Sequence, residues 1–446
     1  MSGAAAEWDV AVVGGGMAGL AAALRLVGLR VVLIEAEPRF GGRVETLDVG
    51  GFTWNRGAQV VIDRSGPTAR LADDLGVSLR KINKCGIPLW MSGKLIQARS
   101  DFSLFAALPL SLTDKVALAM LMVKVRMRYG AALAKAPDPT DPTQRFLDSE
   151  QLDRFVRASS MPSRELWDSL ARNSTSLAAA QVAAFQPLSN LLHLTSVEYV
   201  VEGGTGNLVK AIVDALLVQH GTRLIRGRPV KSVTDTDGVA RINLEDGETL
   251  LARHAVLAVP ADIAARIVDD LPSWKRTALQ AIDYAEDASV AFSLSRPATD
   301  FLPHGIWRLP VVGRGMIGLC NAEHASPPDQ PRRIAGMIRG YTGHDTAHLL
   351  RNMAGEDRHA FLLADLDAIL PGAAAACTDV QVALWQRADS PWRVGRLKHI
   401  EALARPTGRI FFCGDYVDPS GMNGAVLTGQ RAAAQLCAAR LGEGAR

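Results

Sequence analysis

The chain has 446 residues, with 48% hydrophobic residues, 21% charged residues and a net charge of +3 at pH 7. A chain of this length is too long for one simple core, and we expect two domains in an ordinary globular protein. The weak positive charge comes without a basic block carrying interleaved aromatics, so nothing in the composition calls for a nucleic-acid partner.

The five cysteines are odd in number, lie far apart and form no C-x-x-C pair. This pattern favours reduced thiols and argues against a zinc site or a disulfide framework. No apolar run reaches the roughly 18 residues of a membrane span. No positively charged leader with an apolar core precedes the first predicted strand, and we therefore expect a cytoplasmic location.

The chain begins with a predicted strand–helix–strand unit. Val10 to Val13 is an apolar run of strand length, and an Ala/Leu-rich helical segment follows to about Val27. A second apolar run, Val31 to Ile34, ends on Glu35. Between the first strand and the helix, three glycines stand at G-x-G-x-x-G spacing, namely Gly14, Gly16 and Gly19. This order is typical of a dinucleotide-binding βαβ unit.

Each polar or glycine position of that unit has a physical reason. Gly14 allows the tight turn out of the strand, Gly16 lets a pyrophosphate approach the backbone, and Gly19 lets the helix pack close to the strand. The helix N-terminus offers unpaired N–H groups to phosphates. Glu35 is placed to accept hydrogen bonds from ribose hydroxyls, and its charge disfavours a 2′-phosphate. Taken alone, the unit fits NAD as well as FAD.

Further along, Val44 to Val61 is predicted to form a hairpin that leads into the loop Gly57-Ala58-Gln59. Pro67 to Leu75 is predicted to be a helix, and Val77 to Gln97 a set of short strands. Phe102 to about Leu133 is predicted to be helical, with apolar residues on one side and basic residues elsewhere. Such a stretch can lie on a membrane surface, roof a pocket for an apolar substrate, or simply face the core.

Two later segments return to α/β character. Val197 to Glu202 is predicted to be a strand, and a turn and a helix to about Val218 follow it. Short β-rich runs then extend to Pro260. Near the C-terminus, Arg409 to Cys413 is predicted to be a strand that ends in Gly414-Asp415. A helix follows from Ala425 to Arg440, which gives a second strand–turn–helix able to bring backbone N–H groups to a cofactor.

With these motifs in place, the sequence resembles the FAD-dependent amine oxidase superfamily. That group includes monoamine and polyamine oxidases, protoporphyrinogen oxidases and phytoene-desaturase-like enzymes. Both chain ends and the middle β segment carry the resemblance, about a third of the residues. The matching segments are the glycine unit with Glu35, then Gly41-Gly42-Arg43-Val44, Arg228-Pro229-Val230, and Phe412 to Asp415 with Gly421 to Ala425.

The resemblance implies a noncovalent FAD, since no Cys or His stands in an obvious covalent-flavin motif. In relatives the arginine of the Gly-Gly-Arg motif meets the pyrophosphate, and a guanidinium can pair bidentately with phosphate oxygens. The valine position contacts adenine through its backbone, and the last helix N-terminus faces the flavin ring. The implied cofactor-binding residues are Gly14, Gly16, Met17, Ala18, Gly19, Glu35, Ala36, Gly41, Gly42, Arg43, Gly57, Ala58, Gln59, Val230, Gly414, Asp415, Met422, Asn423 and Ala425.

The implied fold class is α/β. It combines a Rossmann-type FAD-binding domain, built on a parallel sheet plus a β-meander, with an interleaved α+β substrate-binding domain. We expect the FAD-binding domain to comprise 1–80, 197–262 and 405–446. The substrate domain would comprise 81–196, which holds the helical region, and 263–404.

Departures from the family pattern bear on the reaction. Amine oxidases commonly carry a lysine near the flavin, yet the matching strand, Ala288 to Ser293, has none. Gly421 stands where one aromatic of the substrate cage is usual, and the other cage position falls near Leu397. Trp392 is close enough in sequence to substitute, and Trp385 and Trp307 are further pocket candidates, with a core position as the alternative for all three. No catalytic base and no metal ligand is assigned.

The leading hypothesis is therefore an FAD-dependent oxidoreductase that moves a hydride from a substrate C–H bond to the flavin. The missing lysine favours dehydrogenation of a largely apolar or ring substrate, with O2 or another acceptor reoxidising the flavin. Oxidation of an amine to an imine with release of H2O2 is the close alternative. The third hypothesis is a noncatalytic flavoprotein or a redox-neutral isomerase. The oligomeric state stays open.

Overall fold

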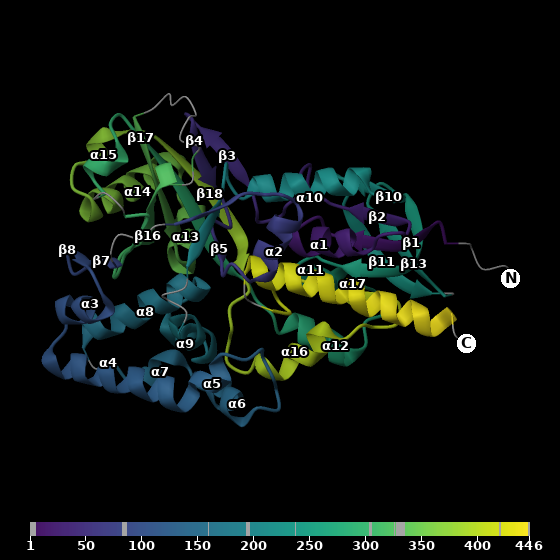
Figure 1. Cartoon of the computed structure of the whole chain (residues 1–446), viewed down its shortest axis with the longest axis horizontal. Helices are drawn as coiled ribbons and strands as arrows, with labels where there is room; N and C mark the ends of the chain where they lie inside the picture. The colour runs from purple at the N-terminus through teal and green to yellow at the C-terminus, as the bar shows by residue number, and fades with distance from the viewer. Residues whose placement is uncertain are drawn as a thin grey trace.

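The computed structural model describes residues 6–82, 87–158, 160–192, 197–236, 238–302, 306–324, 326, 335–418 and 421–444. Two sheets lie at opposite ends of the molecule, and helices cover both (Figure 1). The two chain termini meet at the same end, beside the larger sheet. The part of the predicted strand run at 83–86 lies outside the described residues.

The larger sheet has seven strands in the order β10-β2-β1-β13-β12-β11, with β19 paired to β13. β10, β2, β1, β13 and β19 run parallel, and β11, β12 and β13 form an antiparallel meander. This confirms the expected α/β class with a parallel sheet plus a β-meander. The strands are β1 Trp8–Val13, β2 Val31–Ile34, β10 Thr222–Ile225, β11 Val230–Thr236, β12 Val239–Leu244, β13 Thr249–Leu257 and β19 Ile410–Phe412.

Helices bury both faces of this sheet, which is why its central strands are continuously apolar. In β1, Val10 and Val12 pack toward one face, and Ala11 and Val13 toward the other. The first face carries α1 Met17–Arg25, α10 Gly206–Val218 and α17 Met422–Gly444. The second face carries α11 Ala261–Ile267, α12 Ser273–Gln280 and α16 Ile400–Ala404. Figure 1 shows α1 and α17 running side by side.

The second sheet has five antiparallel strands in the order β15-β16-β17-β14-β18. Their bounds are β14 Ala285–Leu294, β15 Arg308–Pro310, β16 Met316–Asn321, β17 Gly336–Thr342 and β18 Cys377–Asp389. One face packs on α13 His344–Asn352, α14 Gly355–Ile369 and α15 Ala373–Ala376. The other face receives the predicted hairpin, β3 Thr46–Val49 and β4 Phe52–Asn55, through a hydrogen bond of 3.0 Å from Trp54 Nε1 to Ser289 Oγ.

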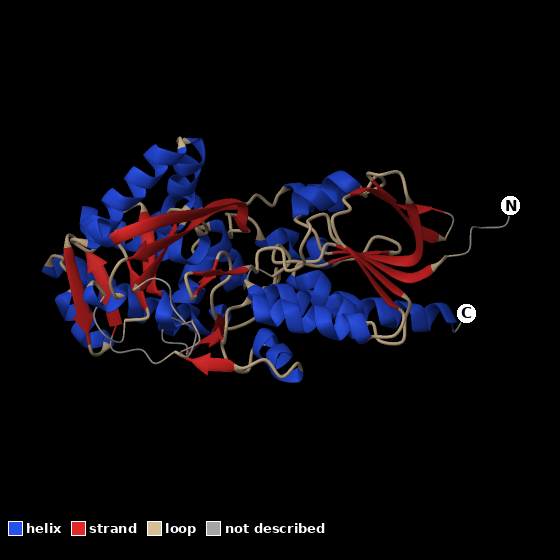
Figure 2. Ribbon diagram, turned by 90° about the horizontal axis from the view of Figure 1, so that it is seen from above, coloured by secondary structure: helices blue, strands red, loops and turns tan. Residues whose placement is uncertain are grey.

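Three smaller elements connect these layers. β5 Val61–Ile62, β9 Glu198–Val201 and β6 Leu79–Lys81 form a short sheet next to α2 Pro67–Asp74. β7 Ile87–Met91 and β8 Lys94–Ala98 form a hairpin. A helical region beneath the five-stranded sheet contains α3 Asp101–Ala107, α4 Leu112–Lys124, a π-helical turn at Val125–Tyr129, α5 Gly130–Leu133, α6 Pro142–Ser149, α7 Leu152–Val156, α8 Met161–Thr175 and α9 Phe185–Leu192 (Figure 1). Seen from above, the strands of the larger sheet lie between helices on both sides (Figure 2).

The stretch from Phe102 to Leu133 is helical as predicted, but it is interrupted. α3 ends at Ala107, and α4 begins after Ser111, whose Oγ accepts a hydrogen bond of 3.1 Å from Asp114 N. Pro109 lies in the break, where a proline favours an interruption because it cannot donate a helical hydrogen bond. Several apolar side chains of α3 and α4 face solvent, so these helices do not simply face the core.

Candidate flavin-binding site

The glycine turn after β1 has the tight geometry that the spacing predicted. Gly14 has a φ of 104°, which an L side chain rarely adopts, and a Cβ at Gly19 would overlap the carbonyl oxygen of Gly14. A Cβ at Gly16 would meet no atom within 4 Å. Open space therefore lies directly in front of α1, at the glycine that a pyrophosphate must approach.

The N-terminus of α1 is free to receive an anion. Gly16 precedes the helix without a side-chain cap, and the first helical hydrogen bond runs from Leu20 N to Gly16 O at 3.0 Å. The backbone N–H groups of Met17, Ala18 and Gly19 thus lack intrahelical acceptors, as the first residues of a helix do. Together with the helix dipole, they form an anion-binding end.

Glu35 is held rigidly at the end of β2. Its carboxylate accepts hydrogen bonds from Gly15 N at 2.5 Å and from Glu37 N at 2.9 Å. Each oxygen keeps a lone pair for a ribose hydroxyl. The neighbouring Ala36 is exposed. Arg228 N donates to Glu35 O at 3.1 Å, which brings the start of β11, and with it the half-buried Val230, next to this carboxylate.

The Gly-Gly-Arg segment packs against the first glycine turn. Gly41 N donates to Gly15 O at 2.8 Å, and Gly42 lies beside Gly16. The chain then places the guanidinium of Arg43 next to Asp415, which follows Gly414 after β19. The two residues form a bidentate ion pair, with Nη1–Oδ2 at 2.6 Å and Nη2–Oδ1 at 2.7 Å.

At this pair, the attraction between the two opposite charges outweighs the effect of burial on both pKa values. Burial alone would raise the pKa of Asp415, but the adjacent Arg43 guanidinium lowers it below its usual range. Likewise, burial would lower the pKa of Arg43, and the charge of Asp415 raises it instead. Arg43 Nη1 also donates to Ala388 O at 2.9 Å, which ties the pair to the end of β18. Both charges therefore persist across the physiological pH range.

A second helix N-terminus opens toward this region. α17 begins at Met422, and Ala425 N makes its first hydrogen bond to Gly421 O at 3.0 Å. The side chain of Asn423 is used structurally, since Oδ1 accepts from Thr68 N and Nδ2 donates to Ile62 O, each at 3.1 Å. Only the backbone of Asn423 is available to a cofactor.

The loop Gly57-Ala58-Gln59 lies between the two halves of the site. Ala58 N donates to Arg43 O at 3.1 Å, and Ala58 O accepts from Thr205 Oγ1 at 2.9 Å. The three loop residues are half-buried. Trp385 lies against the loop, because its Nε1 donates to Arg56 O at 2.7 Å and its ring edge is 3.6 Å from the Cβ position of Gly57.

These features fit a flavin dinucleotide. Gly16 faces open space, the Arg43 side chain keeps 35% of its surface accessible, and Met422 and Ala425 are half-buried at the start of α17. Two helix N-termini, one arginine and the Glu35 carboxylate are the kinds of donors and acceptors that a pyrophosphate and its sugars require. The predicted cofactor residues, far apart in sequence, thus converge on one region.

The residues predicted to line the substrate pocket do not all lie beside the candidate flavin site. Trp392 is fully enclosed in the helical core, with its ring centroid 4.7 Å from that of Phe185 and its Nε1 donating to Asp148 Oδ1 at 2.7 Å. Of the two positions expected for Trp392, pocket or core, the structure therefore gives the core position, because the ring is fully buried and its polar atom is satisfied. Gly421 is exposed just before α17, and Trp307 is buried against Ile82 and Val200.

Sequence reasoning missed a carboxylate pair near Arg43, formed by the half-buried Asp287 and by Asp389. Asp287 on β14 and Asp389 at the end of β18 share Ser176, whose Oγ donates to Asp389 Oδ2 at 2.7 Å and lies 3.5 Å from Asp287 Oδ2. Burial, followed by the charge of Asp389, raises the pKa of Asp287 well above its usual range. Single aspartates in strands carry no motif, so only the strand pairing could reveal them.

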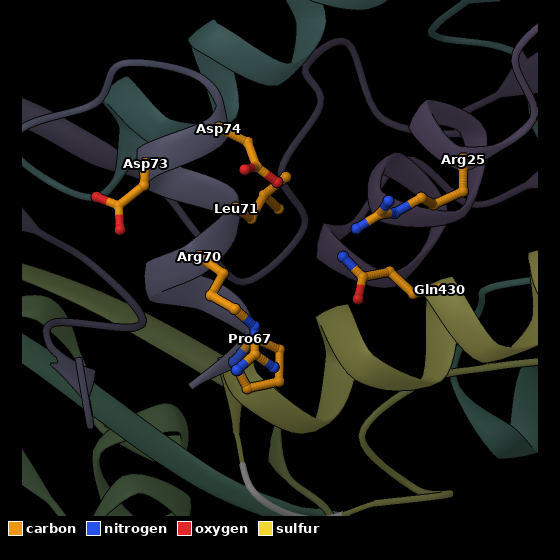
Figure 3. Close-up of a pocket in the computed structure, with 7 residues that line it drawn as sticks. All are labelled: Arg25, Pro67, Arg70, Leu71, Asp73, Asp74 and Gln430. Atoms are coloured by element: carbon orange, nitrogen blue, oxygen red, sulfur yellow. The ribbon is translucent and has the colours of Figure 1, made fainter. Parts of the chain in front are cut away.

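A separate surface cleft of about 200 Å³ lies between α1, α2 and α17 (Figure 3). Its lining includes Arg25, Arg70, Asp74 and Gln430, and it contains none of the predicted site residues. Among the described residues, no group of three or more His, Cys, Asp or Glu side chains could hold a metal ion. No described helix is long and apolar enough to cross a membrane.

Comparison with known proteins identifies the family. A profile for flavin containing amine oxidoreductases matches residues 17–437, and the chain belongs to this family. The computed fold agrees with the structure of putrescine oxidase bound to putrescine, with a TM-score of 0.82 and 23% identity over 97% of this chain and 99% of that one. It also agrees with cyclohexylamine oxidase from Brevibacterium oxydans IH-35A, with a TM-score of 0.80, 20% identity and coverage of 96% and 98%.

Curated relatives agree with this assignment. Lysine-specific histone demethylase 1 homolog 2 of Oryza sativa subsp. japonica is 25% identical over 96% of this chain, which spans 57% of that protein. Coproporphyrinogen III oxidase of Bacillus subtilis is 22% identical over 95% of this chain and 96% of its own length. Mitochondrial protoporphyrinogen oxidase of Nicotiana tabacum is 40% identical over a shorter match, 15% of this chain and 14% of that one. The family implies a flavin cofactor.

Proposed function

We propose that the protein is an FAD-dependent oxidoreductase that removes a hydride from a substrate C–H bond. A bound FAD would supply the hydride-accepting chemistry at this site, with O2 or another acceptor as the final oxidant. The observation that carries the proposal is the convergence of the free α1 N-terminus, Glu35, the Arg43–Asp415 pair and the α17 N-terminus.

The chain's own residues have separate roles in this proposal. The α1 N-terminus and Arg43 bind the pyrophosphate, and Glu35 accepts hydrogen bonds from the adenosine ribose. Asp415 holds the Arg43 guanidinium in place. The positive end of α17 stabilises negative charge brought next to it. No Cys or His stands in an obvious covalent-flavin motif of the sequence, and we propose that FAD is held noncovalently.

For the substrate, the proposal favours a largely apolar or ring compound. β14 carries no lysine, and Trp385 offers an aromatic surface beside the Gly57 loop. Oxidation of an amine with release of H2O2 is a second candidate. Its support is the likeness in fold to putrescine oxidase and cyclohexylamine oxidase over nearly the whole chain.

Anaerobic mixing tests the function and separates the candidates. The FAD-loaded protein is mixed with ring compounds bearing saturated C–C bonds, with porphyrinogens and with primary amines, and the visible flavin absorbance is followed. Bleaching with one class identifies the reaction, and H2O2 release on admitting air identifies an oxidase. If no compound bleaches the flavin, a noncatalytic or redox-neutral flavoprotein replaces the proposal.

We also propose that the exposed face of α3 and α4 contacts an anionic membrane surface. Phe102, Leu112, Met120 and Met127 are 81%, 79%, 68% and 82% exposed, and Val116 and Val123 are exposed on the same stripe. The spacing from Leu112 through Val116, Met120 and Val123 to Met127 places these side chains on one helix face.

Charge favours a membrane with anionic lipids as the partner of this face. Residues 94–135 contain seven Lys and Arg and only two Asp. Lys124, Arg126 and Arg128 are exposed beside the apolar stripe, whereas Asp114 is buried. A basic amphipathic helix of this kind lies in the interfacial plane, and each cation near an anionic surface contributes about 1 kcal/mol.

A further inference from the structure

Two arginines and a cysteine form a row across the five-stranded sheet. Arg308 on β15 is paired with Cys320 on β16, which is paired with Arg339 on β17. Directly paired residues of neighbouring strands share a face. The row therefore lies on one face of the sheet and continues to Ala291 on β14, the partner of Arg339. Trp385 lies on this face as well, because its partner Asp287 alternates with Ala291.

Arg339 is an anomaly within this row. Its side chain is 0% exposed, and none of its three guanidinium nitrogens has a hydrogen-bond partner among the residues that the structure describes. The guanidinium lies 5.1 Å from the centroid of the Trp307 ring, whose Nε1 also lacks a partner. A buried charge without hydrogen bonds is costly, so such a group calls for a ligand or ion that completes it.

Arg396 shows what a satisfied buried arginine looks like in the same protein. It is similarly enclosed, but its terminal nitrogens donate to the carbonyl oxygens of Ser390, Pro391 and Tyr416 at 2.5 to 2.8 Å. Arg339 has no such acceptors among the described residues. Because Arg396 is buried and still hydrogen-bonded, burial alone does not explain why the Arg339 guanidinium has no hydrogen bonds.

Within the described part of the chain, the titratable groups that act on Arg339 carry no negative charge. Burial lowers the pKa of Arg339, and it raises those of the adjacent Cys320 thiol and Tyr341 phenol, which stay neutral. Burial and nearby arginines lower the pKa of His324. Glu198 is the acid whose charge reaches Arg308. Glu198 thus acts on Arg308, whereas the titratable groups that act on Arg339 are the neutral Cys320 and Tyr341.

Arg308 is the more solvent-accessible of the two arginines. Arg308 is half-buried, donates to Asn173 Oδ1 at 2.7 Å and lies 5.0 Å from the centroid of the Tyr341 ring. Tyr341 is also half-buried and lies over Gly318, where any side chain would collide with its hydroxyl. Arg308 and Tyr341 are therefore the partly accessible members of this cluster, and Arg339 is its enclosed member.

The row lies close to the proposed flavin. Trp307, which stacks on Arg339, packs against Val60 and Val200. Val60 directly follows the Gly57-Ala58-Gln59 loop. Glu198 is paired with Ile62 in the adjoining short sheet. The same sheet face thus carries Trp385, which contacts this loop, and Arg339, which is linked through Trp307 to the chain that follows the loop.

We propose that Arg308 and Arg339 form a receptor for a carboxylate group carried by the substrate. Arg308 pairs with the carboxylate directly, and Arg339 supplies the second positive charge behind it. The planar guanidinium fork matches a carboxylate, and the uncompensated charge repels a protonated amine placed there. This inference rests on the proposed function and sharpens it, since it gives the ring or apolar substrate an acidic substituent.

Thermal stability with a simple carboxylate tests the receptor. The FAD-loaded protein is heated with increasing phenylacetate and, separately, with its neutral analogue phenylacetamide. A ligand that binds only the folded protein raises Tm with concentration. We expect a saturating rise with phenylacetate only, together with a shift in the visible flavin spectrum. Arg308→Gln should weaken the apparent affinity at least tenfold, and Arg339→Gln should weaken it as well.

Arg296→Gln serves as the matched control, since Arg296 follows β14 and pairs at the surface with Asp300. It should keep the full response. Equal responses to phenylacetate and phenylacetamide, or an undiminished response in Arg308→Gln, would overturn the receptor. Should Arg339→Gln fail to fold, Arg308→Gln and the amide comparison decide the question. Flavin bleaching by uncharged substrates without any phenylacetate response would refute the receptor and leave the proposed function intact.

Discussion

Arg43 and Asp415 stand 372 positions apart in sequence and form a bidentate ion pair at 2.6 and 2.7 Å. The pair joins the loop after the first βαβ unit to the loop after the last strand of the larger sheet. The first loop packs against the glycine turn that precedes α1, and the second leads to the N-terminus of α17. The ion pair is therefore the point at which the two chain ends are fixed relative to one another.

Arg43→Ala should lower FAD affinity at least tenfold, about 1.4 kcal/mol, because one phosphate-binding guanidinium is lost. It should also destabilise the protein, since Asp415 is left buried without its partner. FAD titration by fluorescence quenching and a thermal melt measure the two effects. Arg64→Ala removes an exposed ion pair with Asp73 and should change neither. Equal FAD affinity in Arg43→Ala and the wild type would place the phosphate elsewhere.

Two glycines of the first turn should respond differently to substitution. Gly16→Val adds a side chain to open space, so the protein should fold with nearly unchanged Tm while FAD affinity falls at least tenfold. Gly19→Ala forces a Cβ into the Gly14 carbonyl and should cost about 1–3 kcal/mol of stability. Thermal melts and FAD titrations of both variants provide the comparison. A Gly16→Val protein that binds FAD normally would contradict the site.

Asp287 should make stability fall as pH rises. Its pKa is raised by burial and by Asp389, so above the usual aspartate range the folded protein holds a proton that the unfolded chain has lost. The free energy of unfolding therefore decreases from the ordinary pKa of aspartate up through the raised one. Asp287→Asn removes this dependence and should raise Tm most at the upper end of that window.

A series of melts from acidic to neutral pH checks this expectation. Asp283→Asn is the control, because Asp283 is an exposed partner of Arg393 on the same approach to β14. Its Tm should follow the wild type at every pH. Parallel Tm curves for Asp287→Asn and the wild type would mean that Asp287 does not hold its proton.

The apolar stripe on α4 and the π-helical turn after it predicts binding to anionic vesicles. The protein should sediment with vesicles of phosphatidylcholine and phosphatidylserine, bind pure phosphatidylcholine more weakly, and lose binding as salt is raised. Replacing Met120 and Met127 together by Glu should abolish binding without loss of folding, since both side chains face solvent. Leu217→Glu, on the exposed side of α10, is the control. A protein that ignores both vesicles and dimerises through this stripe would contradict the proposal.

Local patterns predicted much of the fold. The first βαβ unit, the 46–55 hairpin and the C-terminal strand–helix follow from short-range signals: apolar runs, turn glycines and a carboxylate at a strand end. The assembly of β19 beside β13 required the family resemblance, because no local signal specifies which strands pair. The division into domains stays a prediction.

Site residues without a local pattern could not be predicted. Arg308, Arg339 and Asp287 are single charged residues inside strands, and their significance depends on partners brought by sheet register. Trp392 was a pocket candidate by its place in sequence, yet Asp148 and Phe185 enclose it. Sequence distance to a motif therefore says little about which side of a helix or loop a side chain occupies.

The most direct test of the central claim is the cofactor content of the purified protein. The protein is incubated with FAD, freed of excess by gel filtration, and then heat-denatured and analysed for its released flavin. Our account predicts a yellow protein that carries one FAD per chain and releases it completely on denaturation. A colourless protein that takes up no FAD would contradict the account, and flavin that stays attached to the denatured chain would refute noncovalent binding.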